Sequence, residues 1–264
     1  MRERISRLVP DAAKRALDRR RSARFLAIVR PATDEHVRRH GLEVRRGPLT
    51  GLRYLPELAQ TSGDLVAKLV GTYEQELRPA LEDWISASPT TIVDVGSAEG
   101  TYAVGLAVAI PRARVLAFDI DPAARARCRA MAELNGVADR VRVLGACTHD
   151  VLNGLAPDDL SLFLDCEGCE IELLRPDLVP AMRRWPIIVE LHDFVDPSIT
   201  TTIVERFSAT HDVRLVEGSD REAADLPELG GLDRRTRTAL LSEFRPAAMR
   251  WGVLTPRHRR ESVS

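Results

Sequence analysis

The sequence predicts an α/β fold built on a mostly parallel sheet with helices on both faces. The first observation is that, from residue 90 onward, short runs rich in β-branched and apolar residues alternate with stretches of helical spacing. The second is that glycine or acidic residues follow several of these runs. Because such sheets bind ligands at the carboxyl ends of their strands, the residues after each run are the functional candidates. Five runs are expected to be strands: Thr91–Val95, Arg114–Phe118, Val141–Leu144, Leu160–Leu164 and Ile187–Leu191.

Two more strands are expected near the end of the chain, and a smaller region is expected before the sheet. The segments "HDVRLVEG" (211–218) and "MRWGVLTPR" (249–257) look like strands, the second antiparallel. Residues 65–86 read as helical, whereas the glycines in "EVRRGPLTGLRYL" (43–55) indicate a hairpin or loop over the main domain. We therefore divide the chain into a basic helical cap with a hairpin (1–62) and a main domain (63–264).

The composition is that of an ordinary globular chain. It has 264 residues, 44% of them hydrophobic, which is enough for a substantial core. No apolar run approaches the roughly 20 residues of a membrane span, so no membrane partner is expected. An N-terminal secretory pattern is absent, so we expect a cytoplasmic protein with reduced cysteines. The net charge of -1 gives no general attraction for nucleic acid.

The first 46 residues are strongly basic. Residues 2–46 contain fourteen Arg or Lys against six Asp or Glu. Because Ile5, Leu8 and Ala12 fall near helical spacing, we interpret this segment as a solvated or docking helix. A contact with nucleic acid or an acidic membrane is the alternative.

The first predicted strand leads into "VDVGSAEGTYAVGLA", a strand-to-helix turn with Asp94, Gly96 and Gly100. The glycines allow a tight turn and a close approach of a ligand, and the helix behind offers free N–H groups. The dinucleotide fingerprint G-x-G-x-x-G is absent because Ala98 lies between the two glycines. An acid at this turn would repel a pyrophosphate but suits a ligand with an ammonium group and hydroxyls, such as S-adenosylmethionine (SAM). We expect Asp94, Gly96, Ser97 and Gly100 to bind it.

The second predicted strand ends in "VLAFDIDP". A carboxylate at the tip of this strand, Asp119, is placed to accept hydrogen bonds from both hydroxyls of an adenosine ribose. The apolar Ile120 beside it would cover the adenine. Each motif is weak alone, but together, on consecutive strands, they predict an adenosine-containing ligand.

Residues 71–193 resemble a class I SAM-dependent methyltransferase. The motifs "DVGSAEGTYAV", "AFDIDP", "LDCEGCEIELL" and "IVELHD" are most similar to the FkbM-type branch, which reads Asp-Val-Gly-Ala-x-x-Gly, Phe-Glu-Pro, Asp-Val-Glu-Gly-x-Glu and Glu-x-His. The chain departs from it with Asp119 for the usual glutamate, an inserted Ile120-Asp121, and cysteines at 166 and 169. The resemblance implies a Rossmann-like seven-stranded sheet, SAM as methyl donor and usually an oxygen acceptor on a small molecule or sugar.

Further cofactor residues are expected before the sheet and after its fourth strand. Tyr73 and Glu74 lie in "GTYEQEL", a region that closes over the methionine end of SAM in related enzymes. Glu74 would pair with the ammonium group of SAM, although an exposed helix start explains it equally well. Asp165, which follows the fourth run, is expected to open onto the cofactor cleft.

The hexapeptide Asp165-Cys-Glu-Gly-Cys-Glu170 invites three interpretations: a redox pair, half a zinc site, or small packing residues. A structural zinc needs four ligands, and the other cysteines, Cys128 and Cys147, lie alone in other elements. A thioredoxin-like pair would follow the first strand of its fold. We therefore expect Cys166 and Cys169 to be packing residues.

The acids after the fourth and fifth runs are expected to converge, since burying so many without a function is costly. We expect Glu167, Glu190 and His192 to be catalytic, with His192 as general base and Glu190 or Glu167 as its partner. Glu170 and Asp193 are equally well explained as a helix start and a helix cap. An alternative, not favoured, uses the same oxygens to hold Mg²⁺ and so lower the pKa of the acceptor hydroxyl.

The expected partner is a small-molecule acceptor, and a homodimer is left open. Two other function classes are retained: a methyltransferase for RNA or another macromolecule that uses the basic N-terminus, and a non-catalytic SAM-binding module. Four residues near the end of the chain have a spacing that assigns them no role: Arg221, Glu243, Arg245 and Trp251.

Overall fold

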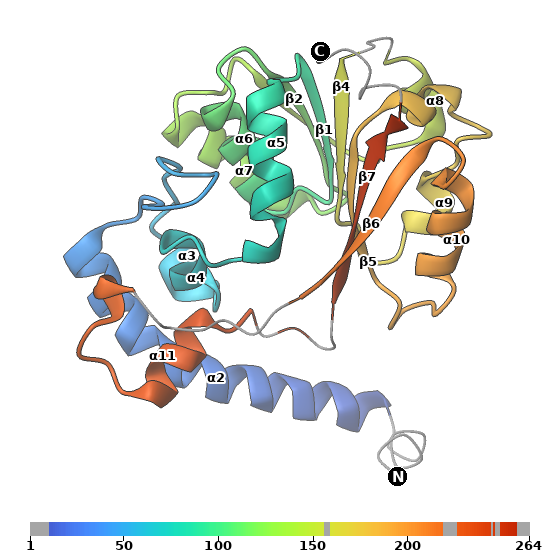
Figure 1. Cartoon of the computed structure of the whole chain (residues 1–264). Coiled ribbons are helices and arrows are strands. Elements are labelled where there is room, and N and C mark those ends of the chain that lie inside the picture. The colour runs from blue at the N-terminus through green and yellow to red at the C-terminus, as the bar shows by residue number, and fades with distance from the viewer. Residues whose placement is uncertain (1–10, 156–158, 219–225, 244, 246–248, 258–264) are drawn as a thin grey trace.

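The fold is the predicted α/β sheet with helices on both faces, Rossmann-like and seven-stranded (Figure 1). The computed structural model describes residues 11–155, 159–218, 226–243, 245 and 249–257. Within these residues the strand order is β3-β2-β1-β4-β5-β7-β6, with β7 antiparallel to β5 and β6 and the other recorded pairs parallel. The strands are β1 (Thr91–Val95), β2 (Arg114–Phe118), β3 (Val141–Leu144), β4 (Leu160–Leu164), β5 (Ile187–Leu191), β6 (His211–Glu217) and β7 (Arg250–Pro256).

Helices on the two faces of the sheet bury two separate apolar clusters (Figure 1). Helices α5, α6 and α7 cover one face and α8, α9 and α10 the other. The helices are α2 (Asp11–His40), α3 (Leu58–Thr61), α4 (Leu65–Leu69), α5 (Arg78–Ala87), α6 (Thr101–Ala109), α7 (Pro122–Leu134), α8 (His149–Asn153), α9 (Glu170–Leu173), α10 (Ile199–Phe207) and α11 (Arg234–Leu241), with 3₁₀ turns η1 (Gln75–Leu77), η2 (Pro180–Arg184) and η3 (Pro227–Leu229).

The N-terminal segment contains the expected helix. Helix α2 packs through Val29 into a cluster with Val66 of α4 and Leu240 of α11, and α2 and α11 lie side by side (Figure 1). Ile5 and Leu8, which contributed to the helical pattern, lie outside the described residues. Among the residues that are described, no helix is both long and apolar enough to cross a bilayer.

The expected hairpin follows α2. Glu43 and Arg53 form an antiparallel bridge. Leu52 and Tyr54 are fully buried, in the same cluster as Ile92 of β1. The hairpin is therefore part of the core on this face of the sheet, and the domain boundary at residue 62 stays a prediction.

The expectation that residues 65–86 are helical is confirmed in part: the segment forms two helices and a 3₁₀ turn, with a non-helical turn between them. Helix α4 ends at Leu69, and α5 begins only at Arg78. Between them Gly71 has φ +71°, and a Cβ at this position would lie 2.3 Å from the carbonyl oxygen of Arg46. Glu74 is also left-handed, with φ +44°. The chain therefore turns here, where the hairpin packs against it.

The loops after β1 and β4 meet in close contact at the centre of the sheet. Chain order reverses there, since β1 lies between β2 and β4, and ligands of such sheets bind at this switch point. Gly96 has φ +88°, and a Cβ on it would lie 1.6 Å from the backbone oxygen of Asp165. Only glycine fits here, so Gly96 is what allows the backbone of Asp165 to lie against the turn after β1.

We predict that Gly96→Ala destabilises the protein much more than Gly136→Ala. Both glycines have positive φ, so alanine costs about 1–2 kcal/mol at either position. At Gly136 nothing lies within 4 Å of the added Cβ, whereas at Gly96 it overlaps backbone. We expect losses of about 1 kcal/mol for Gly136→Ala and more than about 3 kcal/mol for Gly96→Ala in urea unfolding. Equal losses would show that the two loops do not meet in this way.

Candidate functional site

Two adjoining cavities open where β1, β2, β4 and β5 end. The first cavity has a volume of about 950 Å³ including its open mouth, and the second, which we call the acidic cavity, about 610 Å³. Asp165 and Glu167 line both of them. The walls of the first cavity include Gly96, Ala98, Asp119, Ile120, Cys147 and Cys166. Those of the acidic cavity include Tyr73, Glu74, Glu190, His192, Glu243 and Arg245.

Asp119 and Ile120, the residues expected to contact the adenosine, line the first cavity. The Asp119 carboxylate accepts the N–H groups of Ala98 at 2.9 Å and Asp121 at 2.8 Å. Asp121 in turn caps α7, since its carboxylate accepts two N–H groups of that helix. The inserted Ile120-Asp121 therefore fixes the turn that orients Asp119, and the Ile120 side chain is left 82% exposed.

Asp94, Ser97 and Gly100 lie behind the first cavity and do not line it. Asp94 is 1% exposed beneath α6. Burial raises the pKa of Asp94 to about 7, although a hydrogen bond from the Ala103 backbone opposes the rise. Gly100 begins α6 with φ +100°, and Ser97 is buried. These residues build the turn, and of the four expected there Gly96 faces the cavity.

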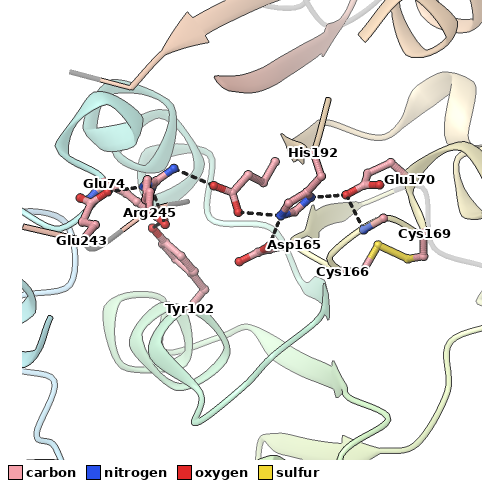
Figure 2. Close-up of polar contacts among 11 residues, drawn as sticks. Glu74, Tyr102, Asp165, Cys166, Cys169, Glu170, His192, Glu243 and Arg245 are labelled. Carbon is pink, nitrogen blue, oxygen red and sulfur yellow. Dashed lines mark hydrogen bonds and ion pairs between the residues drawn. A yellow bond between two sulfur atoms is a disulfide. The ribbon is translucent and has the colours of Figure 1, made fainter. Parts of the chain in front are cut away.

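His192 lies at the centre of a cluster of carboxylates (Figure 2). Its Nδ1 pairs with Glu170, which also accepts the Gly168 N–H at 3.2 Å. Its Nε2 lies 3.3 Å from Glu190 and 3.5 Å from Asp165. Burial disfavours the charged ring, but hydrogen bonds to Glu170 and Glu190 outweigh it and raise the pKa of His192 to about 10. The surrounding carboxylates therefore favour the protonated form of the ring.

Arg245 connects this cluster to the other side of the acidic cavity (Figure 2). Its guanidinium lies 2.9 Å from Glu74, 2.7 Å from Glu190 and 2.5 Å from Glu243. The Tyr102 hydroxyl donates to the second oxygen of Glu74. Contacts thus run without a break from Tyr102 to His192.

Carboxylates outnumber cations among the described residues that line the acidic cavity, and burial, followed by charge and hydrogen bonds, shifts their pKa values. Burial raises the pKa of Glu74 to about 8, against the effect of Arg245. Burial and the charge of Glu190 raise the pKa of Asp165 well above its usual range. Burial also opposes ionisation of Glu190, but hydrogen bonds with His192 and Asp165 lower the pKa of Glu190. A cationic ligand would let more of these acids ionise.

Most of the residues expected to be catalytic or to hold the methionine end come together. Arg245, Glu243 and Tyr102 were missed: Arg245 is 55 positions from Glu190, in a stretch without periodicity. Glu170 does begin α9, but it also holds His192. The contact between Glu170 and His192 could have been predicted from the sequence, because Glu170 follows β4, and β4 pairs with β5, the strand that ends just before His192. The expected residues that line the acidic cavity are Tyr73, Glu74, Asp165, Glu167, Glu190 and His192.

Asp193 stabilises the start of a helix, the structural alternative to a catalytic role that the sequence left open. Its carboxylate accepts the backbone N–H of Thr200 at 3.0 Å and the hydroxyl of the same residue at 2.6 Å. Thr200 lies in the first turn of α10, whose N-cap residue is Ser198, so Asp193 satisfies a free N–H group at the start of that helix from outside it.

The expectation that Cys166 and Cys169 are free packing residues is wrong, because the two form a disulfide. The residues between them, Glu167 and Gly168, both have positive φ, which folds the loop back on itself. The two Cα atoms come within 5.6 Å, a separation that a disulfide spans. Cys128 and Cys147 are free thiols.

The cluster around His192 also meets the geometric requirements of a metal site. Asp165, Glu190 and His192 each offer one ligand atom, and these atoms lie within 4.8 Å of one another. Carboxylate oxygens and an imidazole suit a divalent cation such as Mn²⁺ or Mg²⁺. A cation and the proton on His192 would compete for the same space, so the metal alternative stays open.

We predict that the His192 imidazole titrates far above the usual range in the metal-free, ligand-free protein. The carboxylates around it favour the charged ring, so NMR of the ring in EDTA should give a midpoint above about pH 9, against an ordinary value of 6.5. Glu170→Gln removes one of these charges and should lower the midpoint. A midpoint near 6.5 in the unmodified protein would contradict the geometry.

No protein-family model matches the chain. The release factor glutamine methyltransferase of Chlorobaculum tepidum is 34% identical over 107 residues, so the match spans 40% of this chain and only 33% of that protein. Among solved structures, the chain is similar to an O-methyltransferase from Bacillus cereus in complex with SAH, at 13% identity and a TM-score of 0.46 over 78% of this chain and 84% of that one. It is also similar to the O-methyltransferase TomG of Streptomyces achromogenes in complex with SAM, at 14% identity and a TM-score of 0.42 over 76% and 83% of the two chains.

Proposed function

We propose that the chain is a SAM-dependent methyltransferase that methylates a hydroxyl of a small molecule or sugar. The observation that carries the proposal is the junction of the two cavities at Asp165. One side offers a carboxylate and an apolar side chain at the tip of β2, and the other a buried set of acids around an imidazole. A donor and an acceptor bound in the two cavities would meet at this junction, which is what methyl transfer requires.

The first cavity fits SAM on three counts. Asp119 uses two of its lone pairs on backbone N–H groups and keeps others for the ribose hydroxyls. Ile120 is exposed beside it and supplies an apolar surface for the adenine. Asp165 Oδ1 is buried at the junction and lies 3.5 Å from Nε2 of His192, without a hydrogen bond in the described part of the chain. A positively charged ligand group at the junction would add a second cation beside this oxygen.

His192 is the proposed base: Glu170 holds its Nδ1, and Glu190 lies 3.3 Å from Nε2, the nitrogen that would take the proton. When bound, SAM supplies an activated methyl group and positive charge. A positive charge close to the ring disfavours a second positive charge on it, so bound SAM would lower the pKa of His192. The neutral ring then accepts the proton of the acceptor hydroxyl. Glu167, exposed between the two cavities, is placed to contact either ligand.

The remaining expectations belong to the same proposal. The four sequence motifs favour the FkbM-type branch. A cytoplasmic location and a homodimer stay predictions, as does the cap formed by residues 1–62.

A second candidate comes from the curated relative, whose name describes methylation of a glutamine in a release factor. An acceptor of this kind would be a macromolecule, one of the alternatives expected from the sequence. The acids and imidazole of the acidic cavity favour a hydroxyl, because they are suited to removing its proton. Methyl transfer to small hydroxylated compounds but not to polypeptides would decide between the two.

We predict that Asp119→Asn weakens SAM binding by about 10- to 100-fold in calorimetry. The ribose hydroxyls would lose a charged acceptor, and hydrogen bonds to charged groups contribute about 1.5–3 kcal/mol. Asp139→Asn removes an equal charge from an exposed residue that lines neither cavity and should leave the affinity unchanged. Equal SAM affinities for the unmodified protein and both variants would show that Asp119 does not bind the cofactor.

We predict that His192→Gln keeps SAM binding within about threefold but lowers methyl transfer by about 10²–10⁴. Formation of labelled product from SAM, with a panel of sugars and small hydroxylated compounds, measures this. Glu205→Gln, at an exposed position on α10, is the control and should keep full activity. Activity that survives EDTA would exclude the metal alternative, and full activity of His192→Gln would exclude the base.

A further inference from the structure

The loop that closes the junction of the two cavities is itself closed by a disulfide. Cys166 and Cys169 both line the first cavity and are half-buried, so a small thiol can approach them. Between them, Glu167 has φ +57° and Gly168 φ +117°. A left-handed conformation costs a residue other than glycine about 1–2 kcal/mol, so Glu167 is expected to leave it when nothing holds it there.

This loop is connected to both cavities by contacts on either side of the disulfide. On the N-terminal side, the Asp165 backbone packs against Gly96, and its side chain reaches His192. On the C-terminal side, the Gly168 N–H donates to Glu170, which holds Nδ1 of His192. A change in the shape of the loop therefore reaches the wall of the first cavity and the orientation of the imidazole.

We propose that Cys166 and Cys169 form a thiol–disulfide modification site that controls this junction. The disulfide form holds the loop in the conformation described, with Glu167 and Gly168 left-handed. Reduction frees the loop, breaks the Gly168–Glu170 hydrogen bond and loosens His192. In the cytoplasm, the location expected from the sequence, a disulfide is usually transient and catalytic or redox-sensing, which fits a switch better than a permanent cross-link.

The reaction partner is a dithiol. One thiolate of the dithiol attacks a cysteine sulfur, the Cys166–Cys169 bond breaks, and a mixed disulfide forms. The second thiol of the dithiol then displaces the cysteine. The dithiol is oxidised to a disulfide, and the cysteine pair gains two electrons and two protons.

The test compares the full chain after treatment with diamide or with dithiothreitol. Mass spectrometry with thiol labelling should find Cys166 and Cys169 linked after diamide and free after dithiothreitol. Hydrogen exchange of residues 167–170 should be at least about tenfold faster in the reduced protein, and the NMR signal of the His192 ring should shift. Absence of the linkage after diamide, or identical exchange and ring signals in both forms, would overturn the proposal.

Variants assign the effect to this pair. Cys166→Ser with Cys169→Ser should behave like the reduced protein under both treatments. Cys147→Ser leaves the pair intact and should still respond, so loss of the response in that variant would contradict the assignment. Reduction should also weaken SAM binding by about tenfold, an arm that rests on the proposed function. If neither form binds SAM while exchange still responds, the proposed function fails and the modification site stands.

Discussion

The structure of the site depends on two cations that hold a larger number of carboxylates beside the ends of β4 and β5. His192 is shared by Glu170, Glu190 and Asp165, and Arg245 by Glu74, Glu190 and Glu243. Each acid alone would be costly to bury, and together they are tolerated because each faces the ring, the guanidinium or both. The excess of acidic side chains at the junction is the basis of the proposal that the site binds a positively charged ligand.

The sheet makes this arrangement possible. Parallel strands place the residues that follow them along one edge, so the loops after β4 and β5 bring Asp165, Glu170 and His192 within contact distance. The left-handed Gly96 lets the turn after β1 approach the backbone of Asp165, so that the first cavity and the acidic cavity share a wall. The disulfide lies in that wall, so a change in the conformation of its loop would alter both cavities.

The sequence predicted the strands well, because their apolar runs are short, buried and bounded by turn residues. It also pointed to Asp119 and Ile120, which line the first cavity because they follow a strand tip, and their role toward a cofactor stays a prediction. Asp94 was expected at the ligand but lies under α6, since alternation along β1 turns its side chain to that face of the sheet. Arg245 reaches Glu190 from a distant part of the chain, and no local pattern encodes such a contact. The disulfide depends on two left-handed residues that spacing alone does not reveal.

A crystal structure with S-adenosylhomocysteine, the demethylated product of SAM, tests the central claim most directly. The account predicts the nucleoside in the first cavity, its ribose hydroxyls on the Asp119 carboxylate, its adenine against Ile120, and its sulfur facing Asp165 and the acidic cavity. A product bound elsewhere, or with its sulfur turned away from Asp165, would contradict the account.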